Sequence, residues 1–434
     1  MTGKTKIAAK TFLKKGKLFQ SIKGMADILP IDQDYWRSFW QTAFKVSSRH
    51  GFYFIETPIL EPASLFEASI GATTDIVEKQ MYVFKTPGGD RVALRPEGTA
   101  GVMRSYLQHR LSYFSLPLKV FYLGPMFRHE KPQAGRYRQF HQLGFEIIGD
   151  NSAFYDAEII LASLDFFRAL GLNDLILKIN SLGCRVCRLA FRQELKNYFS
   201  AYKKELCPDC RRRLGRNPLR ILDCQEPSCR TLKSGSPNIL DYLCQNCNNH
   251  FKAVLELIED NGIKYELDPH LVRGLDYYNR TVFEFVSSGL SFSLGGGGRY
   301  DYLAEIIGHR LVPAVGISLG LERIVEALKI KNISPIKRKR PLVFFAAISE
   351  EAKKKSLGLM EKLRAADIPV VEALGRNSLK SQMKAADKVK SSLVLILGQK
   401  EIFEGSIIIK DLRTGAQENI LLDKLVEEIK KRLS

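Results

Sequence analysis

The chain has 434 residues, of which 45% are hydrophobic and 26% charged, a balance typical of a globular protein. This length predicts two or three domains, and the sequence contains no run of 18 apolar residues that would predict a membrane span. The formal net charge of +19 favours a polyanionic partner but does not choose among DNA, RNA and anionic lipid.

The N-terminal segment is strongly basic. Residues 1–24 contain seven lysines and no acidic residue, which fits either a flexible tail that touches RNA or part of an organellar transit peptide. Transit peptides are rich in Arg and Ser, and this segment has few of either. We therefore interpret residues 1–21 as a basic tail.

Periodicity predicts the main elements of the chain. Helices are expected over residues 32–48 and 156–170, with strands over 52–57, 118–123, 138–146, 175–180 and 281–286. Strands 118–123 and 138–146 flank a basic loop and form a predicted hairpin. From residue 184 the composition becomes charged, Cys-rich and punctuated by proline, which indicates a helical insertion over about 184–255.

A basic stretch at residues 331–341 predicts a linker. Strands are then expected over 342–348, 368–374, 392–398 and 406–412, and helices over 350–365, over 378–388 and from 421 onward. This alternation predicts a compact α/β domain over residues 342–434.

Eight cysteines lie between Cys184 and Cys247, and none lies elsewhere. They form four pairs: Cys184 and Cys187, Cys207 and Cys210, Cys224 and Cys229, and Cys244 and Cys247. Such pairs, in a large chain without a secretory signal, favour metal ligands or reduced thiols over disulfides. The thiols suit one or two structural zinc sites of four ligands each. The sequence leaves open which pairs would share a metal, and whether the thiols are instead buried and reduced.

The predicted hairpin carries the most informative side chains. Arg128, Arg136 and Arg138 lie near its ends and tip, and arginine forks pair bidentately with phosphate oxygens. Any one of them could be an ordinary solvated charge, but acceptors and donors at Glu130, Gln142 and Glu146 share the same short element. The hairpin is therefore suited to hold a triphosphate.

The string FRHE, followed by Arg136-x-x-x-Phe140, resembles motif 2 of the class II aminoacyl-tRNA synthetases. The fuller string RPEGT…FRHEKPQAGRYRQFHQ is similar to the histidyl-tRNA synthetase family. Residues 273–278 (RGLDYY) and 294–301 (LGGGGRYD) resemble its histidine-specific motifs, residues 314–323 resemble motif 3, and the helix and strand before Pro58 resemble motif 1.

The resemblance runs from residue 22 to the C-terminus and implies an α/β (α+β) architecture. A class II catalytic domain built on an antiparallel sheet would span residues 22–330 and contain the Cys-rich insertion. An anticodon-binding domain would span residues 342–434. Motif 1 implies a homodimer, although its helix could equally pack on its own core.

The resemblance also implies roles for the residues that bind ATP. Arg128 and Arg273 would be the catalytic pair that clamps the α-phosphate, while Arg136 and Arg323 would engage the γ-phosphate. Phe140 and Arg323 would enclose adenine, Glu130 would lie on the adenine side, and magnesium would bridge the outer phosphates. The implied ATP-binding residues are Arg128, Glu130, Arg136, Phe140, Arg273 and Arg323.

For histidine, the implied residues are Glu97, Gly98, Thr99, Arg128, Gln142, Glu146, Arg273, Tyr277 and Tyr278. The ammonium would meet Glu97, Thr99 and Gln142, and the imidazole would lie between Glu146 and Tyr278. Because adjacent strand residues face opposite ways, we expect only one of the two tyrosines to point at the substrate.

The function implied is ATP-dependent ligation of L-histidine to tRNA(His) through a histidyl-adenylate, by a cytoplasmic homodimer with no membrane partner. The alternative is a non-catalytic paralogue that serves as the regulatory subunit of ATP phosphoribosyltransferase. That paralogue typically lacks the catalytic motifs and the anticodon-binding domain, whereas this chain keeps Arg128, Arg273, Arg323 and a C-terminal domain. His129 and His141 flank the hairpin loop but lack a convincing third ligand, so we interpret them as hydrogen-bonding residues.

Overall fold

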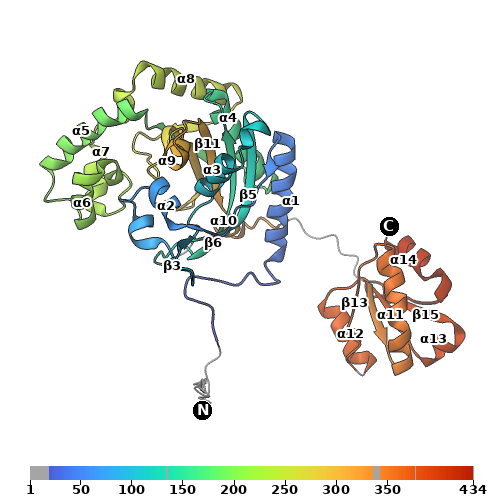
Figure 1. Ribbon diagram of the computed structural model, residues 1–434. Coiled ribbons are helices and arrows are strands. Elements are labelled where there is room, and N and C mark those ends of the chain that lie inside the picture. Colours follow the sequence, from blue (N-terminus) through green and yellow to red (C-terminus); the bar gives the residue numbers. More distant parts are fainter. Residues whose placement is uncertain (1–18, 133–134, 336–342, 377, 434) are drawn as a thin grey trace, which may run out of the picture. The chain divides into compact units, whose positions relative to one another are not determined.

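The computed structural model describes residues 19–132, 135–335, 343–376 and 378–433 (Figure 1). The chain forms two compact units that divide between residues 336 and 337. The division falls inside the predicted linker, but Ile333 packs against the core of the first unit, so residues 331–335 belong to that unit. Most of the predicted basic tail lies outside the described residues. None of the helices described is long and apolar enough to cross a membrane.

The first unit is built on an eight-stranded sheet. Its pairs are antiparallel except at the two edges, where β1 runs parallel to β5 and β7 parallel to β8, which agrees with the predicted antiparallel sheet. In spatial order the strands are β1 (Tyr53–Phe54), β5 (Leu118–Phe127), β6 (Gln139–Ile148), β11 (Ala314–Gly320), β10 (Ser293–Arg299), β9 (Asn279–Ser287), β7 (Leu175–Ser181) and β8 (Tyr265–Leu267).

Alternation along the strands divides the core between the two faces of this sheet. Phe121 and Phe145 point to one face, which is covered by α1 (Gln33–His50), α4 (Ala153–Ala169), α8 (Gln245–Asp260) and α10 (Leu321–Ile330). Val120 and Tyr122 point to the other face, where α3 (Thr99–Gln108) and α9 (Leu303–Gly308) pack. A small sheet of β2 (Leu60–Pro62), β4 (Arg91–Leu94) and β3 (Val83–Lys85) and helix α2 (Ala63–Ile70) complete the unit.

The predicted insertion is helical. It contains α5 (Arg185–Ala201), α6 (Pro208–Arg216), α7 (Pro227–Ser234) and the short turn η3 (Pro218–Ile221), which lie to one side of the sheet in Figure 1. Helix α8 continues beyond the expected end of the insertion, and its Val254 and Ile258 are part of the main core. The C-terminal part of the insertion is therefore also a covering layer of the sheet.

The glycine run at 295–298 forms strand β10 rather than a turn. A Cβ at Gly297 would lie 2.0 Å from the carbonyl oxygen of Gly316 on β11, and one at Gly295 would lie 2.3 Å from the side chain of Leu319. These positions therefore need glycine because a neighbouring strand approaches closely. Gly298 in addition has a positive φ of 153°, which residues other than glycine rarely adopt.

The second unit has a five-stranded sheet with the order β13 (Val370–Glu372), β12 (Val343–Ala347), β14 (Leu393–Leu397), β15 (Ser406–Asp411) and β16 (Gln417–Leu421). Its helices are α11 (Glu350–Ala365), α12 (Leu379–Lys388), α13 (Gln399–Glu404) and α14 (Leu425–Leu433). The alternation confirms the predicted α/β fold. The sequence analysis missed α13 and β16, and because β16 ends at Leu421, the last helix begins four residues later than expected.

A buried ionic cluster ties β10 to the helices behind it. The Arg299 side chain is fully buried and donates from Nε to Asp156 Oδ2 over 2.7 Å and from Nη1 to Asp301 Oδ1 over 3.1 Å. His250 of α8 lies 3.4 Å from the other Asp156 oxygen. Burial alone would raise the pKa of Asp156, but the charge of Arg299 together with the interactions of His250 and Thr281 outweighs it, and the pKa is lowered.

Arg299→Met should lower the free energy of unfolding by about 3–5 kcal/mol, because it leaves a buried carboxylate without its cation. Urea unfolding followed by tryptophan fluorescence measures this change in the first unit, which contains Trp36 and Trp40, the two tryptophans of the chain. The control is Lys252→Met, which breaks an exposed pair with Glu256 on α8 and should cost less than about 1 kcal/mol. Equal losses in the two variants would contradict a structural role for the cluster.

Candidate active site

The β5–β6 hairpin sets the position of the arginine-rich loop. Its register runs from Leu118 opposite Ile148 to Phe127 opposite Gln139, so both strands are longer than the sequence predicts. The backbone N–H of Arg128 donates to the Arg138 carbonyl over 2.9 Å, which continues the ladder into the loop. Loop residues 128–138 are therefore held by the sheet at both ends.

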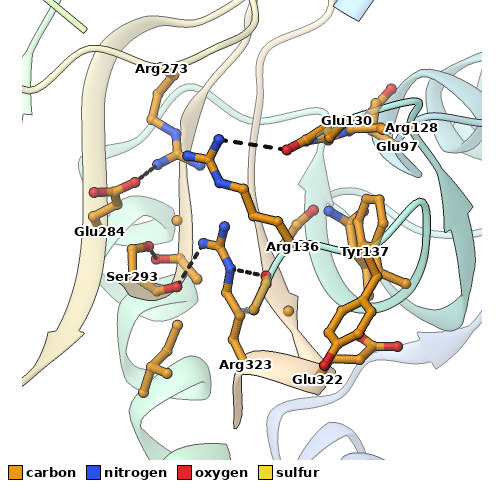
Figure 2. A pocket seen from close by; sticks show the side chains of 18 of the residues that line it. Glu97, Arg128, Glu130, Arg136, Tyr137, Arg273, Glu284, Ser293, Glu322 and Arg323 are labelled. Atoms are coloured by element: carbon orange, nitrogen blue, oxygen red, sulfur yellow. Dashed lines mark hydrogen bonds and ion pairs between the residues drawn. The ribbon is translucent and has the colours of Figure 1, made fainter. Parts of the chain in front are cut away.

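The loop opens onto a cavity of about 160 Å³ beside the glycine strand (Figure 2). Segments that are distant in sequence contribute its walls: the corner before α3, the hairpin, the loop before β9, strands β9, β10 and β11, and helix α10. The predicted residues that line it are Glu97, Arg128, Glu130, Arg136, Phe140, Gln142, Arg273, Tyr278 and Arg323. The structure therefore brings both predicted catalytic arginines to one cavity.

Three of the four cavity arginines donate to acceptors on other segments, and Arg136 pairs with Glu130 within its own loop; Figure 2 shows the contacts of Arg136, Arg273 and Arg323. Arg128 Nε donates to the Pro96 carbonyl over 2.8 Å, and Arg273 Nη1 lies 2.5 Å from Glu284 Oε1. Arg323 donates to the carbonyls of Gly135 and Ser293, each over 2.9 Å. Arg136 lies 3.7 Å from Glu130. The four cations thus keep fixed directions although they repel one another.

Space for Arg273 comes from the glycine strand. A Cβ at Gly296 would lie 2.3 Å from Arg273 Nη1, so only glycine leaves room for this guanidinium. Within the part of the chain that the structure describes, Arg273 Nε is buried with no hydrogen-bond partner.

Acceptors gather on the wall formed by the corner before α3. The Glu97 carboxylate accepts the backbone N–H groups of Thr99 and Ala100, both over 2.7 Å, and burial raises its pKa. Gln142 is buried, and its Oε1 has no partner among the described residues. An unpaired buried acceptor on a cavity wall suits a ligand that donates hydrogen bonds, such as an ammonium group.

Behind this wall lies a buried polar network. Glu146 is fully buried and accepts hydrogen bonds from Thr99 Oγ1 over 2.7 Å and from the Tyr300 hydroxyl over 2.5 Å. Burial raises the pKa of Glu146 to about 8. The Tyr300 phenol therefore contacts Glu146 directly, while Tyr278 lines the cavity. Tyr300 was missed although it lies inside LGGGGRYD, where it follows a glycine run placed beside the cavity.

Comparison with known proteins decides the family. The family model described as histidyl-tRNA synthetase matches residues 24–196 and 230–324, and the one described as anticodon binding domain matches residues 333–432. This chain belongs to the histidyl-tRNA synthetase family. The fold and the family expected from the sequence are thereby confirmed.

Similarity to individual family members extends over almost the whole chain. The chain is 45% identical to the histidine–tRNA ligase of Halothermothrix orenii, over 94% of this chain and 98% of that protein. It is 44% identical to the corresponding ligase of Natranaerobius thermophilus, over 95% and 99%. The crystal structure of apo histidyl-tRNA synthetase from S. aureus matches with a TM-score of 0.80 and 32% identity, and covers 95% of this chain and 100% of that one.

The two adjacent tyrosines of this family member do not lie in a strand, because β9 begins only at Asn279. The expected strand alternation therefore does not apply to them, and their rings pack together with centroids 4.7 Å apart. Tyr278 lines the cavity, while the Tyr277 hydroxyl donates to Glu97 over 3.3 Å. Gly98 and Thr99 lie behind the lining, where a Cβ at Gly98 would meet the Tyr122 ring at 2.3 Å.

The two histidines of the hairpin lie apart from any metal-ligating cluster found among the described residues, since those clusters contain only cysteines. His141 lies 2.8 Å from Glu322 Oε1 through Nδ1, and its ring packs on Trp36. The ring of His129 packs against that of Tyr82. The hydrogen-bonding interpretation therefore fits His141, while His129 makes a ring contact.

Glu146→Gln should change the pH dependence of stability. Because the folded protein raises the pKa of this acid to about 8, it binds the proton more tightly than the unfolded chain, and native stability falls as pH rises from about 4.5 to about 8. The free energy of unfolding of Glu146→Gln relative to the parent should therefore increase between pH 5 and pH 8, by on the order of 2 kcal/mol. Urea titrations at both pH values measure it.

Glu256→Gln on the exposed side of α8 is the matched control for this titration, and its stability relative to the parent should not change with pH. A pH-independent difference for Glu146→Gln would show that Glu146 is not held in its protonated form by burial.

Proposed function

We propose that this chain joins L-histidine to tRNA(His) in two steps. In the first step, a carboxylate oxygen of histidine attacks the α-phosphorus of ATP, bound as its magnesium complex, and pyrophosphate leaves. In the second, the terminal ribose hydroxyl of the tRNA attacks the acyl carbon of the histidyl-adenylate, and AMP leaves. The observation that carries the proposal is the convergence of Arg128 and Arg273 on one cavity beside the unpaired acceptor of Gln142.

Neither step requires a side-chain nucleophile, because the substrate supplies its own carboxylate. Catalysis then depends on positioning and on stabilising the charge that develops at the α-phosphorus. Arg128 and Arg273 bind that phosphate from opposite sides, and their acceptors Pro96 and Glu284 hold both forks in direction. Arg136 and Arg323 bind the γ-phosphate, which would neutralise two more of the mutually repelling cations.

Adenine stacks on the Phe140 ring, with Glu130 at its edge and Arg323 on its far side. In the structure, the Arg128 guanidinium lies 5.2 Å from the centre of the Phe140 ring.

Histidine occupies the inner end of the cavity. Its ammonium group donates to Gln142 Oε1, with Glu97 behind it, and its ring nitrogens pair with Tyr278, which lines the cavity, and with the buried Glu146. An analogue without ring nitrogens could not make these hydrogen bonds, which predicts discrimination on the order of 10⁴-fold without an editing site.

The tRNA is bound through its phosphates and its anticodon. The net charge of +19 supports the first contact, which predicts affinity that falls as salt rises. The second unit supports the contact with the anticodon, because it matches the anticodon-binding family model. The regulatory-subunit alternative is not favoured, because the cavity arginines and this second unit are both present. Eight free cysteines support a reducing, cytoplasmic location.

A homodimer is part of the proposal. Helix α1 has two apolar faces: Phe39 and Val46 are buried in the core, while Trp40 and Phe44 are exposed and cluster with Phe54 of β1. An exposed aromatic cluster on the segment that resembles motif 1 suits a contact with a second copy of the chain. One face of this helix therefore packs on the core of its own chain, and the other face is the proposed dimer contact.

Arg273→Ala should reduce histidine-dependent exchange of pyrophosphate into ATP by at least about 10²-fold, because it removes one of the two cations at the α-phosphorus. The assay uses each of the twenty amino acids with the parent and histidine with the variant. Arg168→Ala, an exposed substitution on α4, is the control and should leave exchange unchanged. Near-normal exchange in Arg273→Ala, or exchange by the parent with a different amino acid alone, would refute the assignment.

The double variant Trp40→Glu/Phe44→Glu should be monomeric, because it places charges in the aromatic cluster. Sedimentation equilibrium measures the mass of the parent and the variant. Leu357→Glu, an exposed apolar position on α11, is the control and should retain the dimer. A monomeric parent would sink the dimer proposal without affecting the proposed chemistry.

A further inference from the structure

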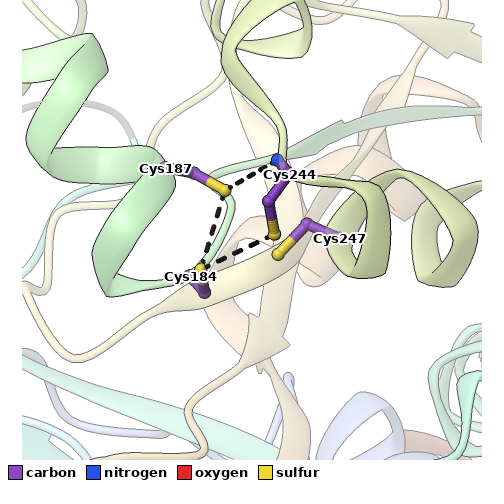
Figure 3. Close-up of side chains that lie close together, drawn as sticks. All are labelled: Cys184, Cys187, Cys244 and Cys247. Carbon is purple, nitrogen blue, oxygen red and sulfur yellow. Dashed lines mark hydrogen bonds between the residues drawn. The ribbon is translucent and has the colours of Figure 1, made fainter.

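The eight cysteines of the insertion form two separate clusters. In the outer cluster, Cys184 and Cys187 at the start of α5 meet Cys244 and Cys247 at the start of α8 (Figure 3). The inner cluster contains Cys207, Cys210, Cys224 and Cys229. In each cluster the four Sγ atoms lie within 4.8 Å of one another. The sequence left open which cysteine pairs would share a metal. In the structure, the first and last pairs along the chain share one cluster, and the two middle pairs share the other.

The sulfur positions fit tetrahedral coordination. Zinc–sulfur bonds of about 2.3 Å in a tetrahedron place the sulfurs about 3.8 Å apart. Cys184 Sγ lies 3.6 Å from Cys187 Sγ and 4.0 Å from Cys244 Sγ, and Cys207 Sγ lies 3.9 Å from Cys224 Sγ. A disulfide would require about 2.0 Å, so these separations match a shared metal ion and not a covalent bond.

Helix starts and backbone donors also lie at the sulfurs. Cys184, Cys207 and Cys244 are the N-cap residues of α5, α6 and α8, where the helix dipole stabilises negative charge. Backbone N–H groups point at the sulfurs, from Cys244 to Cys187 over 3.1 Å and from Cys207 to Cys229 over 3.3 Å. Buried neutral thiols would gain much less from these donors.

We propose that each cluster binds one zinc ion through four thiolates, and that the two ions together brace the loop 271–278 that carries Arg273 and Tyr278. The metal sites stand on the sulfur geometry alone. The effect on substrate handling rests on the proposed function.

The inner cluster supports the Arg273 side of the loop. Turn η3 lies between Cys210 and Cys224, and all four of its residues are buried. From this turn Arg220 Nη1 donates to the Arg273 carbonyl over 3.0 Å, and the preceding Asn217 donates to Asp276 Oδ1 over 3.1 Å. Since the family model does not match residues 197–229, this support is inferred from the contacts of this chain alone.

The outer cluster supports the Tyr278 side. Arg188 follows Cys187 directly on α5, and its Nη1 donates to the Tyr278 carbonyl over 2.8 Å. The two carbonyls at the ends of the substrate-facing loop are thus each held by an arginine that lies close in sequence to a zinc ligand. Arg188 and Arg220 act as positioning residues, because they contact the loop backbone.

Elemental analysis of the purified full-length chain should find two equivalents of zinc. Cys184→Ser/Cys244→Ser and Cys207→Ser/Cys224→Ser should each retain one equivalent. Cobalt titration of the chelated parent should give the thiolate charge-transfer absorption of tetrahedral sites at two equivalents, which counts the sites even where a variant folds poorly. Less than about half an equivalent of zinc in the parent, together with no cobalt signal, would overturn the proposal.

The variant Arg220→Ala tests whether the insertion positions the loop. It should keep two equivalents of zinc. Because Arg273 would then be misplaced, kcat/KM for histidine-dependent exchange should fall by about 10- to 100-fold. Arg220→Lys keeps a donor and should recover most of this loss, while urea midpoints report any general destabilisation. The control is Arg212→Ala, exposed on α6, with exchange unchanged. Unchanged exchange in Arg220→Ala, or no recovery with lysine, would overturn the brace.

The zinc sites and the proposed function can be refuted independently of each other. A parent chain that holds two zinc ions but shows no exchange would contradict the proposed function and support the metal sites. An active parent without zinc would contradict the metal sites and leave the proposed function in place.

Discussion

Mutual repulsion among four guanidinium groups is the constraint around which the first unit is arranged. Burial and the neighbouring charge of Arg136 both lower the pKa of Arg323, whereas the charges of Glu284 and other nearby acids outweigh burial and raise the pKa of Arg273. The groups that accept hydrogen bonds from these arginines lie on the corner before α3, the hairpin and strands β9 and β10. No single segment of the chain could supply all of them. A ligand with several negative charges relieves this repulsion most, and a triphosphate is such a ligand.

The inner end of the cavity follows the opposite principle. Here the groups are carboxyls and phenols, and burial raises the pKa of Glu97, Glu146 and Tyr300. An arginine-rich outer part and an inner part of carboxyls and phenols can share one small cavity because hydrogen bonds hold these side chains in direction. Such fixed dipoles need little reorganisation when substrate arrives, which is the condition for electrostatic catalysis.

The sequence was informative where the signal is local. The hairpin follows from two apolar runs around a basic loop, and its arginines therefore could be placed at one site in advance. Tyr300 could not be found as the partner of Glu146, nor Glu284 as the partner of Arg273, because each pair joins a strand residue to a loop residue whose position depends on the tertiary fold. The same reason left the cysteine pairing open, since spacing along the chain does not show which helix starts meet.

Loop 271–278 shows why the insertion matters to the site. It is neither helix nor strand, so its buried carbonyls have no ladder to satisfy them and need donors from elsewhere. A strand would have turned Tyr277 and Tyr278 to opposite faces, whereas this loop places both beside the cavity wall. Because the loop has no strand partner, the carbonyls of Arg273 and Tyr278 depend on hydrogen bonds from Arg220 and Arg188. Segments far from the substrate therefore become part of what positions it.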